Sequence, residues 1–94
     1  MTGARQIAKR RIKRTDNSFV ELSIHEVPAP LKGSEHRYKY RLALVVAGIC
    51  VMRYDNEAGK GDHKHIGAAE LPYVFTDLET LLRDFFADVK RMEK

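Results

Sequence analysis

The sequence contains no tryptophan, one cysteine and three prolines in 94 residues. The single cysteine, Cys50, cannot form a disulfide within the chain, whereas small secreted domains usually depend on several disulfides. We therefore expect a cytoplasmic protein that is stabilised by an apolar core. Because Cys50 lies between Ile49 and Val51, we expect it to be a small buried hydrophobic residue rather than a nucleophile.

Long apolar segments are also absent. The longest uncharged apolar run, residues 42–52, is eleven residues long and contains Gly48, whereas a membrane-spanning helix needs about 20 residues. The positive charges near the N-terminus are not followed by the apolar segment of a signal peptide. We expect no membrane association, and we expect residues 1–94 to form one domain, because the chain is shorter than the usual domain of about 100–150 residues.

Positive charge is concentrated at the start of the chain. The sequence has 17 Lys and Arg against 13 Asp and Glu, a net charge of +4. Six of the positive charges precede Asp16, the first acidic residue: Arg5, Lys9, Arg10, Arg11, Lys13 and Arg14. We expect residues 1–14 to form a basic edge strand or arm, because dense charge on an edge strand discourages pairing with other chains.

Alternating apolar and polar side chains predict β-strands over the first half of the chain. In residues 19–27, Val20, Leu22 and Ile24 share one face, which is the pattern of a half-buried strand. The predicted strands are residues 7–14, 19–27, 37–47 and 49–55. Residues 55–69 combine glycines with charges, and we expect them to form a loop.

A helix is predicted at residues 77–92. Thr76 and Glu79 have the spacing of a capping box. Apolar residues then recur at helical spacing: Leu78, Leu81, Leu82, Phe85, Phe86, Val89 and Met92. A single helix with such a face must cover a sheet. The sequence therefore predicts an α+β fold in which an antiparallel meander of about four strands is covered by one C-terminal helix.

The densest group of reactive side chains lies at residues 60–65. In an extended backbone the rings of His63 and His65 point to the same side. They could act as general base and general acid in phosphodiester cleavage, with Lys60 and Lys64 stabilising the developing charge. The same histidines with Asp62 could instead bind a divalent metal, or the segment could be a solvated loop. The spacing does not choose among these three interpretations.

Further residues could bind phosphate or a base. Arg53 could hold a phosphate, and Tyr54 could stack on a base or transfer a proton, unless Tyr54 belongs to the core. The other candidate phosphate-binding residues are Arg10, Arg11, Arg37, Lys39 and Arg41. Such a basic surface is typical of nucleic-acid binding, although many charged surfaces are simply solvated.

Several segments together resemble a known protein family. They are residues 27–30 (VPAP), 33–42 (GSEHRYKYRL), 53–57 (RYDNE), 59–65 (GKGDHKH) and 72–75 (PYVF), followed by the helix that contains Asp84 and Phe85. In these strings the chain resembles the TumE-like (DUF6516) family over about residues 24–89. Members often have a further acidic residue directly after the HxH and its glycine, where this chain has Gly67, two alanines and Glu70.

The resemblance implies the toxin of a toxin–antitoxin pair that acts on RNA and is neutralised by a helix-turn-helix antitoxin encoded beside it. It assigns no catalytic residues. Our hypothesis is a small endoribonuclease whose candidate catalytic residues are Asp62, His63, His65 and Tyr54. The alternatives are a non-catalytic nucleic-acid- or protein-binding module, and a transferase acting on RNA ends or on protein. We expect no organic cofactor, with a divalent metal as an alternative, and a second copy of the chain is a candidate partner.

Overall fold

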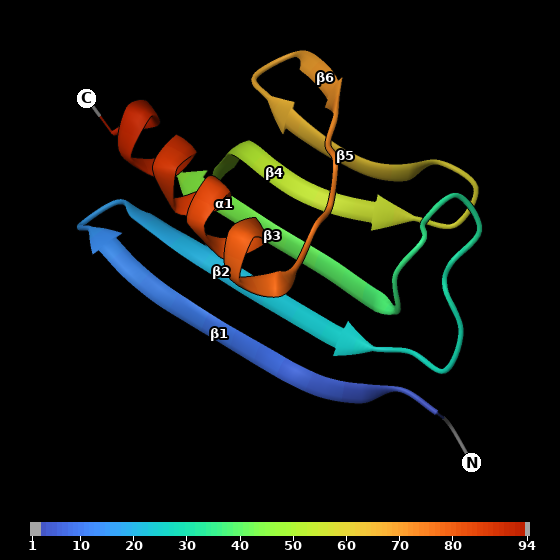
Figure 1. Ribbon diagram of the computed structural model, residues 1–94. Helices are drawn as coiled ribbons and strands as arrows, with labels where there is room; N and C mark the ends of the chain where they lie inside the picture. Colours follow the sequence, from blue (N-terminus) through green and yellow to red (C-terminus); the bar gives the residue numbers. More distant parts are fainter. Residues whose placement is uncertain (1–2, 94) are drawn as a thin grey trace.

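The computed structural model describes residues 3–93 and consists of one sheet and one helix (Figure 1). The elements are β1 (Arg5–Thr15), β2 (Ser18–Glu26), β3 (Tyr38–Val46), β4 (Ile49–Glu57), β5 (Gly61–Ile66), β6 (Ala69–Pro72) and α1 (Leu78–Met92). The six strands pair antiparallel in sequence order. This meander with a C-terminal helix confirms the predicted α+β fold, with six strands instead of about four.

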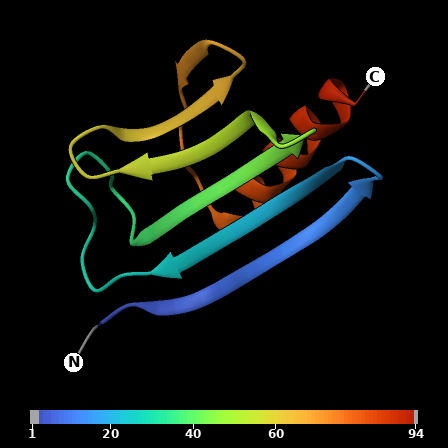
Figure 2. The same cartoon turned by 180° about the vertical axis from the view of Figure 1, so that it is seen from behind.

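The helix covers one face of the sheet only. α1 crosses the sheet on the face that is turned to the viewer in Figure 1, and the opposite face, seen in Figure 2, has no described segment over it. We call this uncovered surface the open face. Within residues 3–93 no helix is both long enough and apolar enough to cross a membrane.

The expected loop at residues 55–69 was wrong. These residues complete β4, form the whole of β5 and begin β6. Asp55 and Asn56 are buried in β4, and Asn56 bonds the backbone of β3 through its side chain, at Tyr40 N and Tyr38 O. Polar composition concealed the strands because the buried polar side chains have partners that lie far away in the sequence.

Most of the basic segment at the N-terminus lies in β1, an edge strand of the sheet. β1 pairs with β2 along its length, from Arg5 opposite Glu26 to Thr15 opposite Ser18. Its other edge has no neighbouring strand in the sheet. Residues 1 and 2 of the predicted basic arm lie outside the described residues. Because β1 is part of the sheet, it supplies charge from a fixed surface and not from a free arm.

The core lies between α1 and the face of the sheet that it covers. Leu81, Phe85 and Val89 of α1 are fully buried, and the Phe85 ring meets Tyr54 edge to face at 5.5 Å between centroids. The sheet contributes alternate residues of three strands, as the period-two pattern predicted: Val20, Leu22, Ile24, Tyr40, Leu42, Leu44, Met52 and Tyr54. Met92, which we expected on the apolar helix face, is 38% exposed.

Two local predictions need correction. The helix N-cap is Asp77 and not Thr76, because Asp77 Oδ1 accepts the Thr80 N–H at 2.7 Å. Cys50 is exposed and not buried. It lies at the start of β4, where a register shift after Leu44 interrupts the alternation between the two faces.

A carboxylate of α1 is buried against the sheet. Asp88 is 6% exposed and accepts hydrogen bonds from the Tyr54 hydroxyl, from Lys64 Nζ at 3.3 Å and from Arg91. Burial alone would raise the pKa of Asp88, but the hydrogen bonds from Tyr54 and Lys64 outweigh it and hold the pKa below its ordinary value. The charged form of Asp88 therefore stabilises the packing of α1 on the sheet.

This linkage predicts how acid affects stability. The pKa of Asp88 is lower in the folded than in the unfolded protein. The stabilisation that the ionised Asp88 gives to the folded state is therefore present above about pH 4 and is lost as the pH falls through the folded-state pKa. Asp88→Asn should lower the free energy of unfolding at pH 7 by about 1–3 kcal/mol and reduce its decline between pH 5 and pH 2. Urea unfolding at several pH values measures both effects.

The matched control is Asp16→Asn, which removes a carboxylate whose side chain is fully exposed. It should change stability by less than about 0.5 kcal/mol. Equal effects of the two substitutions would contradict a stabilising role for the buried Asp88 carboxylate.

Candidate functional site

The alternation of side chains in β5 divides the predicted catalytic segment between two faces. His65 pairs with Arg53 of β4 and with Glu70 of β6. His63 pairs with Asp55 of β4. Paired residues of neighbouring strands lie on the same face of a sheet. Both histidines therefore lie on the open face, together with their neighbours in β4 and β6.

A carboxylate faces both imidazoles. Glu70 Oε2 is 3.8 Å from His63 Nε2 and 3.9 Å from His65 Nε2, and His65 Nε2 is also 3.8 Å from Asp55 Oδ1. His63 Nδ1 lies 3.0 Å from the Gly61 carbonyl oxygen, and because a carbonyl oxygen can only accept a hydrogen bond, this contact places a proton on Nδ1. The two histidine side chains are 20% and 26% exposed, so a solvent-borne ligand can reach them.

Cations border this pair on two sides. Arg53 Nε is 2.9 Å from Asp55 Oδ2, although its N–H is not aimed at this oxygen and has no hydrogen-bond partner among residues 3–93. Lys60, in the β4–β5 turn, lies 3.7 Å from Glu70. Arg41 is exposed on β3 opposite Asp55, and its side chain has no ion-pair or hydrogen-bond partner within the described residues. Arg41 is therefore free to bind an anion.

Most other predicted phosphate-binding residues have protein partners or lie elsewhere. Lys39 donates a hydrogen bond to the Asn56 carbonyl at 2.9 Å, and Arg11 pairs with Glu21 at 2.7 Å. Arg10 is exposed opposite Leu22, on the side of the sheet that α1 covers. Arg37 is exposed just before β3.

Tyr54 and Lys64 do not belong to the open face. Lys64 is paired with Tyr54 across β4 and β5, and both side chains turn toward α1, where they bond Asp88. Burial raises the pKa of Tyr54, and the hydrogen bond to Asp88 raises it further by a smaller amount. The structure therefore places the hydroxyl of Tyr54 in the core, away from His63 and His65.

Asp62 turns to the face of β5 opposite His63 and His65, where it joins a cluster that the sequence did not reveal. Ser34 donates to Asp62 Oδ1 at 2.6 Å, and both Tyr40 OH and His36 Nε2 bond Oδ2 at 2.7 Å. His36 Nδ1 accepts the Tyr38 N–H at 3.1 Å, so its Nε2 holds the proton that is donated to Asp62. Ser34 and Asp62 are 28 residues apart, and no spacing motif joins them.

The cluster fixes loops at the end of the sheet. The Asp62 side chain is 8% exposed, and the His36 ring stacks on Phe75, 3.8 Å between centroids. Gly33 and Gly61 pack backbone to backbone, since a Cβ built on Gly33 would lie 2.8 Å from Gly61 N. Asp62 thus holds the β2–β3 connection and the segment before α1 against β5.

A divalent metal bound by Asp62, His63 and His65 was one alternative left open by the sequence, and the structure does not bring these three side chains together. Asp62 lies on the other face of β5 from His63 and His65, as the pairing of Asp62 with Asn56 shows. Among residues 3–93, no group of three or more His, Cys, Asp or Glu is arranged to hold a metal ion. The geometry instead presents two imidazoles, one shared carboxylate and nearby cations, which is a set of groups suited to proton transfer beside an anion.

The position of Asp62 leads to a prediction. Asp62→Ala would leave the hydrogen-bond donors of Ser34, His36 and Tyr40 without their acceptor. Loss of a buried carboxylate that three donors share should lower the free energy of unfolding by about 3 kcal/mol or more. Thermal melting should fall by many degrees. Glu57→Ala, an exposed carboxylate on the neighbouring β4, is the control and should melt like the wild type. Unchanged melting of the Asp62 variant would contradict a structural role.

Comparison with known proteins agrees with the resemblance found in the sequence. No curated protein and no solved structure matches the chain. Residues 3–93 match the family described as Toxin TumE, which spans every strand and the helix. Since this match covers nearly the whole sequence, the chain belongs to the TumE toxin family.

Proposed function

We propose that this TumE-family toxin acts as an endoribonuclease and that the open face of its sheet is the active site. The observation that supports the proposal is the position of His63 and His65: both are accessible, both face Glu70, and cations flank them. Two imidazoles beside a bound phosphate are sufficient for general acid–base cleavage of RNA. The proposal leaves Asp62, Tyr54 and Lys64 out of the chemistry, because they stabilise the fold.

The roles of the two histidines follow from their neighbours. His63, with its Nδ1 proton directed at the Gly61 carbonyl, has Nε2 available as the general base. A protonated His65 would have a carboxylate within 4 Å on each side, at Asp55 and at Glu70, and we assign it as the general acid. Glu70 faces both rings and positions them.

The reaction is an internal phosphoryl transfer. His63 takes the proton of the ribose 2′-hydroxyl, whose oxygen attacks the adjacent phosphorus. The bond to the 5′-oxygen breaks as His65 gives its proton to that oxygen. The products are a 2′,3′-cyclic phosphate and a 5′-hydroxyl, and proton exchange with water restores the starting states of both histidines. No oxidant or external nucleophile is required.

Nearby cations stabilise the charge that develops on phosphorus. Arg41 has no protein partner among residues 3–93 and can bind a non-bridging oxygen or the next phosphate. The charges of Arg53 and Lys60 are partly offset by Asp55 and Glu70, against which they lie, so Arg41 supplies most of the positive charge. Preorganised charges of this kind stabilise a transition state because they need no rearrangement during the reaction.

The proposed biological setting follows from the family. A toxin of this family implies an antitoxin partner, and we propose that the antitoxin is a helix-turn-helix protein encoded nearby. We also propose that the toxin acts in the cytoplasm. A non-catalytic RNA-binding module is the competing function. It would use the same basic surface but would not depend on the two histidines.

The central prediction concerns the histidines. His63→Ala and His65→Ala should each reduce the cleavage rate of an oligoribonucleotide by at least about a hundredfold, the lower end for loss of a general acid or base. Because both side chains are partly exposed, melting should change by less than about 0.5 kcal/mol. The control is His25→Ala, which removes a histidine from β2 on the same face and should leave the rate unchanged. Full activity of the double variant would remove these residues from the mechanism.

The pH dependence should separate the two roles. The wild-type kcat/KM should be bell-shaped, since the base must be deprotonated and the acid protonated. Residual activity of His63→Ala should lose the acidic limb, and that of His65→Ala should lose the alkaline limb. Steady-state rates between pH 4.5 and pH 9 measure this. If His63→Ala loses the alkaline limb and His65→Ala the acidic limb, the two roles are exchanged. Activity that EDTA abolishes and added metal restores would contradict metal-free acid–base catalysis.

A further inference from the structure

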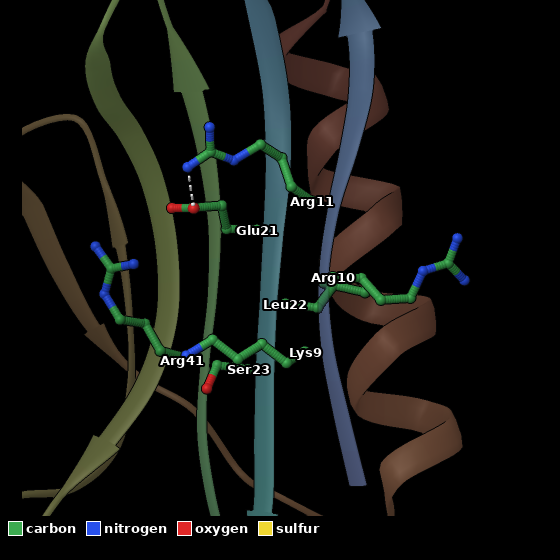
Figure 3. Close-up of a pocket in the computed structure, with 7 residues that line it drawn as sticks. All are labelled: Lys9, Arg10, Arg11, Glu21, Leu22, Ser23 and Arg41. Carbon is green, nitrogen blue, oxygen red and sulfur yellow. Dashed lines mark hydrogen bonds and ion pairs between the residues drawn. The ribbon is translucent and has the colours of Figure 1, made fainter. Parts of the chain in front are cut away.

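A groove lies on the open face near the β1 edge of the sheet, whereas the histidines lie on the same face nearer the β6 edge. It is formed by β1, β2 and β3 and has a volume of about 320 Å³. Figure 3 shows Lys9, Arg11 and Arg41 projecting to one side of the sheet, and Arg10 projecting to the other, toward the helix. Glu21 and Ser23 also face the groove, whereas Leu22, which pairs with Arg10, turns its side chain into the core on the covered face.

The groove combines free cations with a hydroxyl. Within residues 3–93 the side chains of Lys9 and Arg41 have no ion-pair or hydrogen-bond partner, whereas Arg11 is held by Glu21 at 2.7 Å. Lys9 pairs with Ser23, and Ser23 pairs with Arg41. The three side chains therefore form one row across β1, β2 and β3, with the hydroxyl between the two cations. Such an arrangement suits a phosphate group.

The same row continues to the proposed active site. Arg41 pairs with Asp55, and Asp55 pairs with His63. Since neighbouring strands lie about 4.8 Å apart, the row spans about 19 Å from β1 to β5. A nucleic-acid strand that crosses the sheet along this row would meet Lys9 and Arg41 before it reaches the histidines.

We propose that this groove is a phosphate-binding subsite for single-stranded RNA whose scissile phosphate lies at His63 and His65. The inference rests on the proposed function and extends it to the substrate class. The row accommodates about four nucleotides, which is the lower end of site sizes in folds that bind single strands. A dinucleotide would occupy the histidine end and leave the groove empty.

Two features favour a single strand of any sequence. In-line attack by the 2′-oxygen requires a rotated backbone that an A-form duplex does not provide. The open face of the described strands also has no exposed stack of Phe, Tyr or Trp, since Phe19 lies under the Arg11 guanidinium at 4.4 Å. Without a stacking surface, phosphate contacts dominate and base preference is weak.

The test compares neighbouring cations on opposite faces of β1. Binding of 2′-O-methyl oligoribonucleotides, which cannot form the 2′-nucleophile, is measured for lengths of two and six nucleotides over a range of salt concentrations. For the hexanucleotide, Lys9→Ala should reduce the slope of log K against log[salt] by about 0.7, the value for one phosphate contact of a single strand. Arg10→Ala removes the same charge from the other face and should leave the slope nearly unchanged.

A gain-of-affinity variant complements the loss. Glu21→Gln removes the carboxylate that holds Arg11, so it should increase hexanucleotide affinity and steepen the salt dependence. The dinucleotide should respond to neither Lys9→Ala nor Glu21→Gln. Lower affinity of the Glu21 variant for the hexanucleotide would overturn the assignment.

Further outcomes separate the subsite from the cleavage chemistry. Equal effects of Lys9→Ala and Arg10→Ala would overturn the subsite and indicate general charge attraction. Preference for a duplex hexamer would overturn the choice of single-stranded RNA. If the histidine variants cleave normally but the length-dependent effect of Lys9 remains, the proposed mechanism and the position of the scissile phosphate fail, and the phosphate-binding groove stands. Absence of wild-type binding at low salt would overturn both.

Discussion

The geometry of β5 is the constraint on which the rest of the molecule depends. Alternate residues of this strand face opposite sides of the sheet, so Asp62 and Lys64 turn toward the covered side while His63 and His65 stay on the open face. The inward pair bonds the β2–β3 connection and α1 through carboxylates and hydroxyls. Each inward anchor therefore holds the neighbouring histidines in position. A shift of one residue in register would bury the imidazoles and expose the anchors.

Charge pairing decides which of the many cations can bind a ligand. The six N-terminal positive charges suggested a broad phosphate-binding surface, but Arg5, Arg11, Lys13 and Arg14 lie within 4 Å of carboxylates. Lys9 and Arg41 remain free on the open face within the described residues, and they lie in the same row as His63. Net charge alone therefore overstates the binding surface, whereas strand register identifies the cations that share a face with the histidines.

Patterns of short range in the sequence predicted most of the fold, and contacts of long range explain what was missed. The strands over residues 7–55 and the helix followed from periods of two and 3.6 residues. β5 and β6 were missed because their side chains are polar, and because the partners of Asp62 are distant in the sequence. The i, i+2 spacing of His63 and His65 correctly placed both on one face. The same alternation, applied to Asp62, would have separated it from the two histidines, whereas the face of Tyr54 follows only from the register between β4 and β5. Glu70 could be identified only from the β5–β6 pairing.

The role of the open face as the active site is tested most directly by observing the histidine side chains while RNA binds. Long-range ¹H–¹⁵N NMR spectra would follow the imidazole signals of His25, His36, His63 and His65 during titration with a 2′-O-methyl hexanucleotide. We expect the signals of His63 and His65 to shift together as the oligonucleotide saturates the protein. His36, whose two nitrogens bond Tyr38 and Asp62, should not change. Shifts at His36 with none at His63 and His65 would contradict the assignment of the open face as the active site.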